Sequence, residues 1–373
     1  MYQTPYKPRP PESCAECGFL DDCGGLEGKA YAKGCFARCV EHCQYHGCDV
    51  ACPCLHLNFP DLLEEAGGLW APPERELTAL VSASTLPYYI AQIDHGGSRD
   101  AALREEIVAV PLSALVGRVR RGWYDVRFDS PAALRHALKL SEETDIIVSS
   151  VAPDQVLEDF WEEHVARDIL PRLALLRLRA MTVPNFSFMT DVTRLNSLRN
   201  LSRMFRVAER ISGAGIATIL HLQASTRHDW GKWADVLRAQ SSVATVALEF
   251  QTGPKQKEIG DRYYFGLVGL QDSIGRSLHP LVIAGGGRMR QMKTHFRSFT
   301  VIDSTPFIKT MKRRLLIRIG PGRWKWRRRF TPPKQSLSQR LVLNVNAHRR
   351  RFHEIIGIIP DLGNQRFLFP PAA

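Results

Sequence analysis

Short apolar runs alternate with segments of helical periodicity over most of the chain after residue 70. Eight of these runs have the length and the polar flanks that are typical of buried strands. The predicted strands are Tyr88–Asp94, Ile107–Val110, Asp145–Ser150, Ala174–Val183, Ile216–Leu222, Val243–Phe250, Pro280–Ala284 and Phe299–Asp303. Eight strands that alternate with helices predict an α/β fold, and they favour a (β/α)8 barrel of the TIM type over a doubly wound open sheet.

Helical periodicity is clearest in four segments. The predicted helices are Val156–Ile169, Leu195–Ser212, Asp229–Ala239 and Thr305–Arg314. The face of the second helix that we expect to be buried carries Leu198, Leu201, Phe205, Ala208 and Ile211. Residues 111–140 fit neither period well, although Trp123–Phe128 within this insertion predicts an additional strand.

Composition places the chain among ordinary globular proteins, because 44% of its 373 residues are hydrophobic and 24% are charged. No uncharged apolar run reaches the length of about 18 residues that a membrane span needs. The first 13 residues, MYQTPYKPRPPES, lack the apolar segment of a secretory signal. We therefore expect a cytoplasmic protein that does not bind membranes.

Positive charge is concentrated near the C-terminus. Residues 309–353 hold 15 Lys and Arg and no Asp or Glu, whereas the rest of the chain holds 35 bases and 38 acids. Within this stretch, Trp324, Trp326 and Phe330 lie among the bases. Bases neutralise phosphates and aromatic faces stack on nucleobases, so the stretch predicts nucleic-acid binding rather than a merely solvated face or a patch for an acidic protein. The residues expected to contact nucleic acid are Arg313, Arg314, Arg323, Trp324, Lys325, Trp326, Arg327, Arg328 and Arg329.

All nine cysteines lie between residues 14 and 54. They are Cys14, Cys17, Cys23, Cys35, Cys39, Cys43, Cys48, Cys52 and Cys54. An odd count and a cytoplasmic setting argue against a disulfide framework, whereas a C-x-x-C-G knuckle and two further close spacings are typical of metal ligands. Thiolates bind zinc or an iron–sulfur cluster, and the spacing leaves both open, with His42, His46 and His56 as possible replacements for a sulfur. The C-x3-C-x2-C spacing of radical-SAM enzymes does not occur.

The composition changes along the chain predict three parts. Residues 1–70 form a cysteine-rich metal-binding module, which is too small and polar for a large core, so we expect a metal to supply much of its stability. Residues 71–315 form the barrel, and residues 316–373 form a basic extension that binds nucleic acid.

Polar side chains stand at nearly every predicted strand end, which is where the chemistry of a barrel gathers. Asp303 is the strongest candidate, because an apolar strand leads directly into its carboxylate, with Thr305 as the expected N-cap and Pro306 at the start of the next helix. An ionised carboxylate there could attack the C1′ atom of a sugar. Asp94 and Glu249 are the first candidates for proton transfer, and Asp191 is a weaker one. The residues expected to bind a base are Asn185, Ser187, His221, Gln223, Gln251 and Gly286.

Several of these segments together resemble the tRNA-guanine transglycosylase superfamily, and the bacterial and phage relatives that insert 7-deazaguanines into DNA most of all. The segments are VPNFSF (183–188), AGIATILHLQA (214–224), DWGKWADVL (229–237), VALEFQTG (246–253) and FTVIDSTPFIKTMKRR (299–314). The resemblance covers about 60% of the chain and implies a (β/α)8 barrel that exchanges guanine for a deazaguanine without a redox cofactor. It also implies that Asp303, in the last of these segments, is the nucleophile. The zinc site of the tRNA enzymes follows the barrel, whereas the cysteines here precede it.

Three hypotheses follow from the sequence. The first is a base-exchange enzyme acting on DNA or tRNA, with deazaguanine as the incoming base and with zinc in the cysteine module. The second is a nucleic-acid-binding metalloprotein without catalysis. The third is an iron–sulfur enzyme that uses its cluster for the chemistry. A further protein partner could bind through the cysteine module.

Overall fold

The computed structural model describes residues 12–35, 59–78, 86–119, 122–188, 192–251, 253–320, 322–329, 332 and 335–358. Eight parallel strands form its central sheet. They are β1 (Tyr89–Ala91), β2 (Ile107–Pro111), β5 (Asp145–Ser149), β6 (Ala180–Thr182), β7 (Thr218–His221), β8 (Thr245–Glu249), β9 (His279–Ile283) and β10 (Thr300–Asp303). The strands pair in chain order from β2 and β5 through to β10, and β10 then pairs with β1.

The sheet curls into a nearly closed barrel. An isolated parallel bridge joins Gln92, just after β1, to Ala109 of β2, and the Ile93 N–H donates to the Ala109 carbonyl at 2.9 Å. A sequential order that returns on itself is the topology of a TIM-type barrel and differs from that of a doubly wound sheet. The predicted α/β barrel is therefore confirmed.

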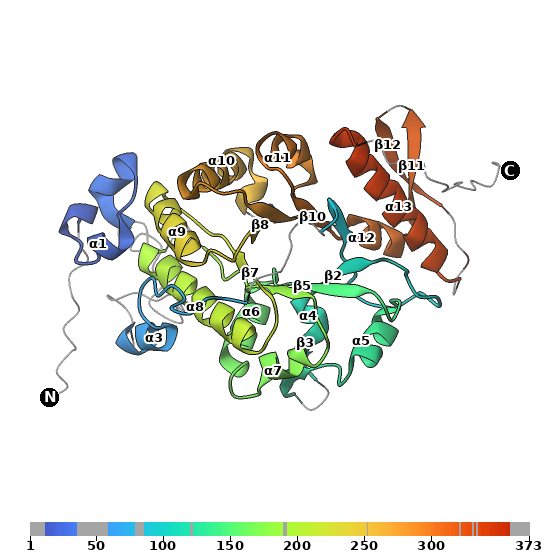
Figure 1. Cartoon of the computed structure of the whole chain (residues 1–373), viewed down its shortest axis with the longest axis horizontal. Coiled ribbons are helices and arrows are strands. Elements are labelled where there is room, and N and C mark those ends of the chain that lie inside the picture. The colour runs from blue at the N-terminus through green and yellow to red at the C-terminus, as the bar shows by residue number, and fades with distance from the viewer. Residues whose placement is uncertain are drawn as a thin grey trace.

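Helices surround the barrel (Figure 1). They are α5 (Pro131–Leu138), α6 (Asp154–Glu163), α7 (Ile169–Ala174), α8 (Arg194–Gly213), α9 (Arg227–Ala239), α10 (Lys257–Ile274), α11 (Met289–His295), α12 (Thr305–Met311) and α13 (Ser338–Ile355). All five residues of the face that we expected α8 to bury are buried, which confirms the periodicity argument. The predicted helix Val156–Ile169 is divided between α6 and α7, and the strand predicted from Ala174 begins only at Ala180.

The insertion between β2 and β5 holds a short helix and a small hairpin. Helix α4 (Leu112–Leu115) leads into β3 (Val116–Arg118), which pairs antiparallel with β4 (Tyr124–Val126). The additional strand predicted within Trp123–Phe128 is therefore present.

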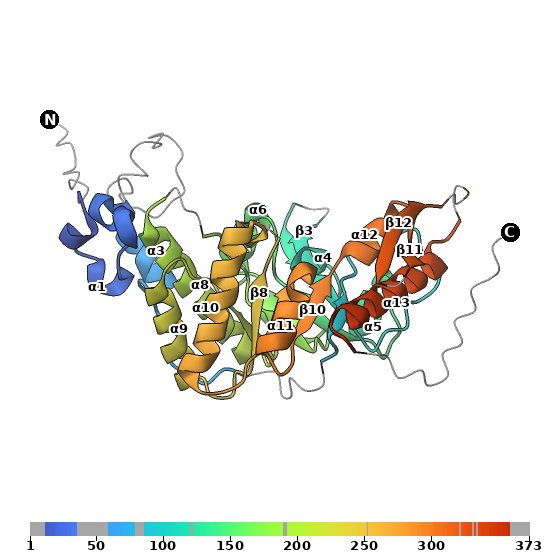
Figure 2. The same ribbon diagram turned by 90° about the horizontal axis from the view of Figure 1, so that it is seen from above.

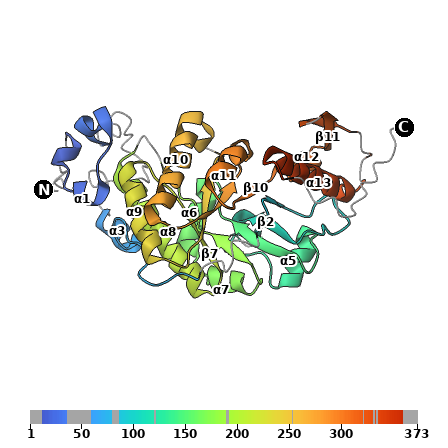
Figure 3. The same cartoon turned by 45° about the horizontal axis from the view of Figure 1, so that its top comes forward.

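The C-terminal part of the described chain forms a hairpin and a helix. Strands β11 (Arg314–Gly320) and β12 (Arg323–Arg328) pair antiparallel, and α13 packs against this hairpin, against α12 and against β1. The predicted boundary between residues 315 and 316 falls inside β11. Figure 3 shows α13 beside α12 and close to β2.

The N-terminal described residues lie at the other end of the molecule. Helix α1 (Leu20–Cys23) lies beside α8, and α3 (Phe59–Ala66) also packs on α8. Figures 1 and 2 place α1, drawn in blue, beyond α8 and α9, whereas the hairpin and α13, drawn in orange and red, lie at the opposite end. None of the described helices has both the length and the apolar character of a membrane span.

Candidate functional site

The barrel interior is filled by small and aliphatic side chains from all eight strands. This interior cluster consists of Leu86, Ile90, Ile107, Ala109, Ile147, Ala180, Ile219, Ala247, Leu281, Ile283 and Ile302. Side chains two positions further along a strand lie on the same face. The next inward layer therefore contains Gln92, Ser149, Thr182, His221 and Glu249, at the carboxyl ends of their strands. This polar layer forms the barrel mouth, the end at which TIM-barrel enzymes bind their substrates.

Asp94 lies beside a pocket at this mouth. The pocket has a volume of about 310 Å³ and is lined by Gln92, Asp94, Pro111, Ser113 and Ala114. The Gln92 amide donates a hydrogen bond to Asp94 Oδ1 at 3.0 Å. Burial raises the pKa of the Asp94 carboxyl, and the Gln92 hydrogen bond and nearby His95 only partly offset this. A carboxyl with a raised pKa is better suited to giving and taking a proton than an ordinary aspartate.

Glu249 and His221 face the same mouth from β8 and β7. Glu249 is 8% exposed, and its Oε2 accepts the Gln251 N–H at 2.7 Å. His221 is buried, its Nδ1 has no hydrogen-bond partner among the described residues, and burial lowers its pKa to about 3. His221 is thus a neutral ring at physiological pH, which offers a hydrogen-bonding nitrogen but cannot supply positive charge.

The structure brings together some of the predicted base-binding residues. The Gln223 side-chain amide donates to the Asn185 side chain and, at 3.0 Å, to the Phe186 carbonyl. Ser187 lies on the same loop, but its hydroxyl donates to Asp154 at the start of α6, at 2.5 Å. Gln251 is exposed at the end of β8.

Gly286 lies where the loop after β9 packs against α13. It begins a single turn of 3-10 helix after β9, and a Cβ atom added there would lie 3.3 Å from the ring of Phe352 on α13. This glycine therefore allows the loop after β9 to approach α13.

Asp303 does not face the barrel mouth as we expected. Its neighbour Ile302 belongs to the interior cluster, and because strand residues alternate, the Asp303 side chain points to the outer side. There its Oδ2 accepts a hydrogen bond from His348 Nε2 of α13 at 3.0 Å, and its Oδ1 accepts the Thr305 N–H at 2.7 Å. The N-cap of α12 is Ser304 rather than Thr305, so the helix begins at Thr305, one residue earlier than the predicted N-cap implies.

The environment of Asp303 favours its ionised form. Burial alone would raise the pKa of this carboxyl, but the hydrogen bonds and charge of His348 and the hydrogen bonds of Thr305 outweigh burial and hold the pKa below its usual value. Tyr89 of β1 lies nearby, with its ring 5.5 Å from that of His348, and burial together with the Asp303 charge raises the pKa of its phenol. Asp303 thus ends β10, Asp94 follows its paired strand β1, and the pKa values of the two carboxyls are shifted in opposite directions.

His348 was not identified from the sequence. It is one of five buried residues, Leu341, Asn344, Val345, His348 and Phe352, that form one stripe of α13. Their spacing of three, four and seven residues is a helical signal, and a histidine within it marks a buried polar group that needs a partner.

The basic hairpin presents its bases and its tryptophans on opposite faces. Trp324 and Trp326 are half-buried; the Trp324 indole N–H donates to Glu354 of α13 at 2.9 Å, and the Trp326 ring lies 6.2 Å from that of His348. The tryptophans therefore pack on α13, which differs from the expectation that they stack on nucleobases.

The other face of β12 carries exposed bases, Arg323, Lys325 and Arg327. Lys325 lies opposite Ile317, and Arg327 lies opposite Leu315. Arg314 and Arg328 form a cross-strand pair on the tryptophan side, and Arg313 and Arg329 flank the hairpin. Phe330 lies outside the described residues.

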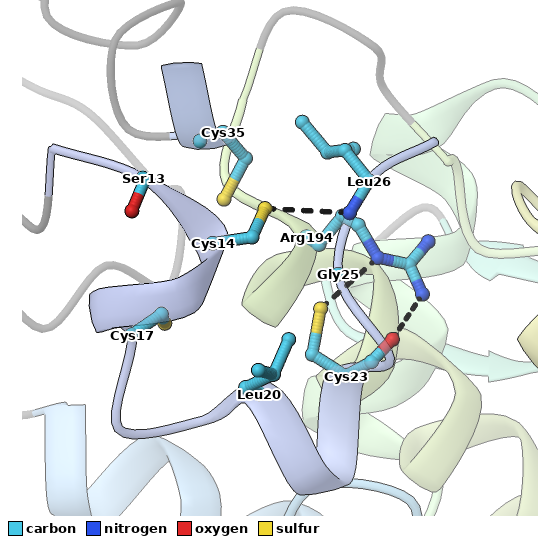
Figure 4. A pocket seen from close by; sticks show the side chains of 10 residues that line it. Ser13, Cys14, Cys17, Leu20, Cys23, Gly25, Leu26, Cys35 and Arg194 are labelled. Carbon is cyan, nitrogen blue, oxygen red and sulfur yellow. Dashed lines mark hydrogen bonds between the residues drawn. The ribbon is translucent and has the colours of Figure 1, made fainter. Parts of the chain in front are cut away.

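Four of the nine predicted metal ligands lie within the described residues. Cys14, Cys17, Cys23 and Cys35 line a single cavity (Figure 4). In the described part of the chain, no group of three or more His, Cys, Asp or Glu side chains is placed to hold a single metal ion. The remaining predicted ligands, Cys39, Cys43, Cys48, Cys52 and Cys54, and the alternative ligands His42, His46 and His56 lie outside the described residues, as does Asp191.

Comparison with known proteins identifies no family for this chain. No protein-family model matches the chain, and the curated proteins contain no significant match to it.

Proposed function

We propose that the chain is an enzyme that exchanges a base in DNA or tRNA, replacing guanine with a 7-deazaguanine at the mouth of the barrel. The observation that carries this proposal is the pair Asp94 and Asp303, which lie at the carboxyl ends of neighbouring strands and have pKa values shifted in opposite directions. One carboxylate kept ionised and one kept ready for a proton is the pairing that a two-step displacement at a sugar carbon requires. The resemblance of segment 299–314 to the transglycosylases agrees with this assignment.

Asp303 is the nucleophile in this proposal. Its carboxylate oxygen forms a bond to C1′ as the bond between C1′ and the guanine nitrogen breaks, and the incoming deazaguanine nitrogen then displaces the carboxylate. Because the Asp303 side chain faces α13, attack requires it to turn away from His348 toward the mouth. His348 keeps the carboxylate ionised until then, and it is a positioning residue.

Asp94 is the proton-transfer group. It protonates the departing guanine and then takes the proton from the incoming base, so the proton balance over both steps is zero. Its raised pKa and its place beside the pocket at the mouth suit this role. Glu249 is the alternative, because it faces the same mouth from β8. Gln223, Asn185 and His221 offer hydrogen-bonding groups to the edge of a base that has been flipped out of its strand.

The exposed bases of β12 bind the phosphate backbone in this proposal. Arg323, Lys325 and Arg327 lie on one face of the hairpin, and a two-stranded ribbon of this kind fits a nucleic-acid groove. The tryptophans contribute by packing the hairpin on α13 rather than by stacking on bases.

Incorporation of labelled guanine into DNA and into tRNA tests the proposal. We expect Asp303→Asn to abolish exchange and Asp94→Asn to reduce it by about 10²–10⁴-fold, the usual range for a proton-transfer group. Asp145→Asn is the matched control, because Asp145 begins β5 at the opposite end of the barrel and is 42% exposed in its ion pair with Arg179. Exchange that survives in Asp303→Asn but is lost in Glu249→Gln would move the nucleophile to β8.

A second candidate function is nucleic-acid binding without catalysis. The observation that favours it is the engagement of both Asp303 oxygens, which is also what a purely structural carboxylate would show. Wild-type protein that binds nucleic acid tightly but exchanges no guanine in either substrate would favour this second function.

A further inference from the structure

The N-terminal segment 12–35 has no hydrophobic core of its own. The buried residues in this segment are Cys14, Cys23, Gly25 and Gly34, and none of its aliphatic or aromatic side chains is buried. A segment of this size cannot hold a fixed shape by apolar burial alone, and a bound metal is the usual substitute. The cavity that its cysteines line takes the place of a core.

The four cysteines reach this cavity from different turns of the segment. Cys14 begins a 3-10 turn, Cys17 follows it, Cys23 ends α1, and Cys35 follows the second 3-10 turn. Figure 4 shows the four side chains arranged around the same space. Gly25 and Gly34 also line it, and their φ angles of +71° and +63° are backbone conformations that turn the chain around the cavity at no steric cost.

Hydrogen-bond donors already face two of the sulfur atoms. The Leu26 N–H donates to Cys14 Sγ at 3.4 Å, and the Arg194 Nε–H donates to Cys23 Sγ at 3.1 Å. Donors of this kind stabilise negative charge on sulfur and are a regular feature around thiolate-bound metal centres.

The arrangement of the four thiols fits a cluster better than a single ion. Zinc holds each thiolate at about 2.3 Å, so its four sulfurs must converge on one point. The described residues contain no group that converges in this way, although all four thiols line one cavity. Four cysteines are the ligand set of a [4Fe–4S] cluster, in which each thiolate binds a different iron, so the four sulfurs need not converge on one point.

The position of the cavity ties it to the barrel. Arg194 is the first residue of α8 and is paired with Asp229 in the first turn of α9. These two helices follow β6 and β7, so their first turns lie at the mouth end of the barrel. The same Arg194 also donates to the Cys23 carbonyl at 2.9 Å.

We propose that Cys14, Cys17, Cys23 and Cys35 together ligate a [4Fe–4S] cluster, which organises the N-terminal segment and docks it through Arg194 on the rim of the barrel mouth. This site does not depend on the base-exchange proposal, because its ligands and its test lie outside the carboxylates of β1 and β10.

Metal and sulfide analysis of the full chain, purified without oxygen, tests this site. We expect about four iron and four sulfide per chain, absorption near 400 nm, and an electron paramagnetic resonance signal after reduction. Cys23→Ser and Cys35→Ser should each lose most of the iron, and circular dichroism should show that the barrel helices remain.

The matched control replaces the other five cysteines, at positions 39, 43, 48, 52 and 54, with serine in one chain. This variant should keep its iron and its absorption band, because its four proposed ligands are intact. Iron that follows these five cysteines instead would overturn the assignment of the ligands. Stoichiometric zinc without iron, or no metal after reconstitution with ferrous iron and sulfide, would overturn the cluster.

Discussion

The buried ion pair between Arg194 and Asp229 gives the sharpest prediction for stability. The side chains are 6% and 1% exposed, and the guanidinium makes two parallel contacts with the carboxylate, at 2.7 and 3.2 Å. Arg194→Met removes the charge but keeps much of the volume, so it leaves a carboxylate buried without its cation.

The expected loss of stability depends on the hydrogen bonds that Asp229 retains in the variant. Breaking a buried ion pair by removing one partner costs about 3–5 kcal/mol. Asp229 Oδ2 still accepts the N–H groups of Ser225, at 2.7 Å, and of Thr226, at 3.0 Å, so we expect the lower end of that range, about 3 kcal/mol in the free energy of unfolding. The variant also loses both contacts between Arg194 and Cys23, so the N-terminal segment should become more sensitive to limited proteolysis.

Urea unfolding of Arg194→Met and of a matched control measures this cost. The control is Arg238→Met, because Arg238 pairs with Asp235 at a similar distance of 2.7 Å but the side chains are 51% and 77% exposed. An exposed pair contributes at most about 1 kcal/mol, so the control should change little. Equal costs in the two variants would refute the argument that burial makes the Arg194 pair important.

Three further predictions concern acid stability and nucleic-acid binding. Burial lowers the pKa of His221 to about 3, so in acid the unfolded chain takes up a proton that the folded chain does not. Stability should therefore fall as the pH drops below about 6.5. The urea midpoint of His221→Gln should fall less steeply over the same pH range than that of the wild type. The pKa of Asp303 is lowered in the folded chain, so its contribution to stability is present above about pH 4 and is lost in acid. Asp303→Asn should therefore lower the free energy of unfolding by about 1.5–3 kcal/mol at pH 7 and by less at pH 3. An equal loss at both pH values would contradict the hydrogen bonds of its ionised form. Replacing Arg323, Lys325 and Arg327 with alanine in one chain should make the plot of log binding constant against log salt concentration less steep by up to about 2.7. The control replaces Arg167, Arg179 and Arg238 with alanine, which removes the same charge from exposed ion pairs elsewhere. This control should leave the slope unchanged.

Strand positions in the barrel could be predicted because buried parallel strands are continuous apolar runs. Every one of the eight predicted runs overlaps a strand of the barrel, and their order along the chain is their order around the barrel. Helix α10 was missed because Gly260, Gly266 and Gly269 interrupt its sequence and resemble turn signals. Two of these glycines serve close packing, since a Cβ atom at Gly266 would lie 2.1 Å from Trp230 and one at Gly260 would overlap Arg288.

The direction of Asp303 could not be read from its position at a strand end. Whether a terminal side chain faces the mouth or the outer helices depends on the register of the whole strand, and here Ile302 takes the inward place. The hairpin of β11 and β12 was not predicted for a different reason, because we interpreted the charge of this stretch and not its alternation. The alternation of Trp324 and Trp326 with Arg323, Lys325 and Arg327 has the period of a strand and would have placed the two residue types on opposite faces.

Detection of a covalent intermediate tests whether Asp303 is the nucleophile of a base exchange. Wild-type protein is incubated with DNA or tRNA in the absence of an incoming base, denatured and analysed by mass spectrometry. We expect an adduct in which guanine has left and the nucleic acid is attached to the peptide that contains Asp303, with no adduct in Asp303→Asn. An adduct on another carboxylate, or guanine exchange that proceeds at the wild-type rate in Asp303→Asn, would contradict it.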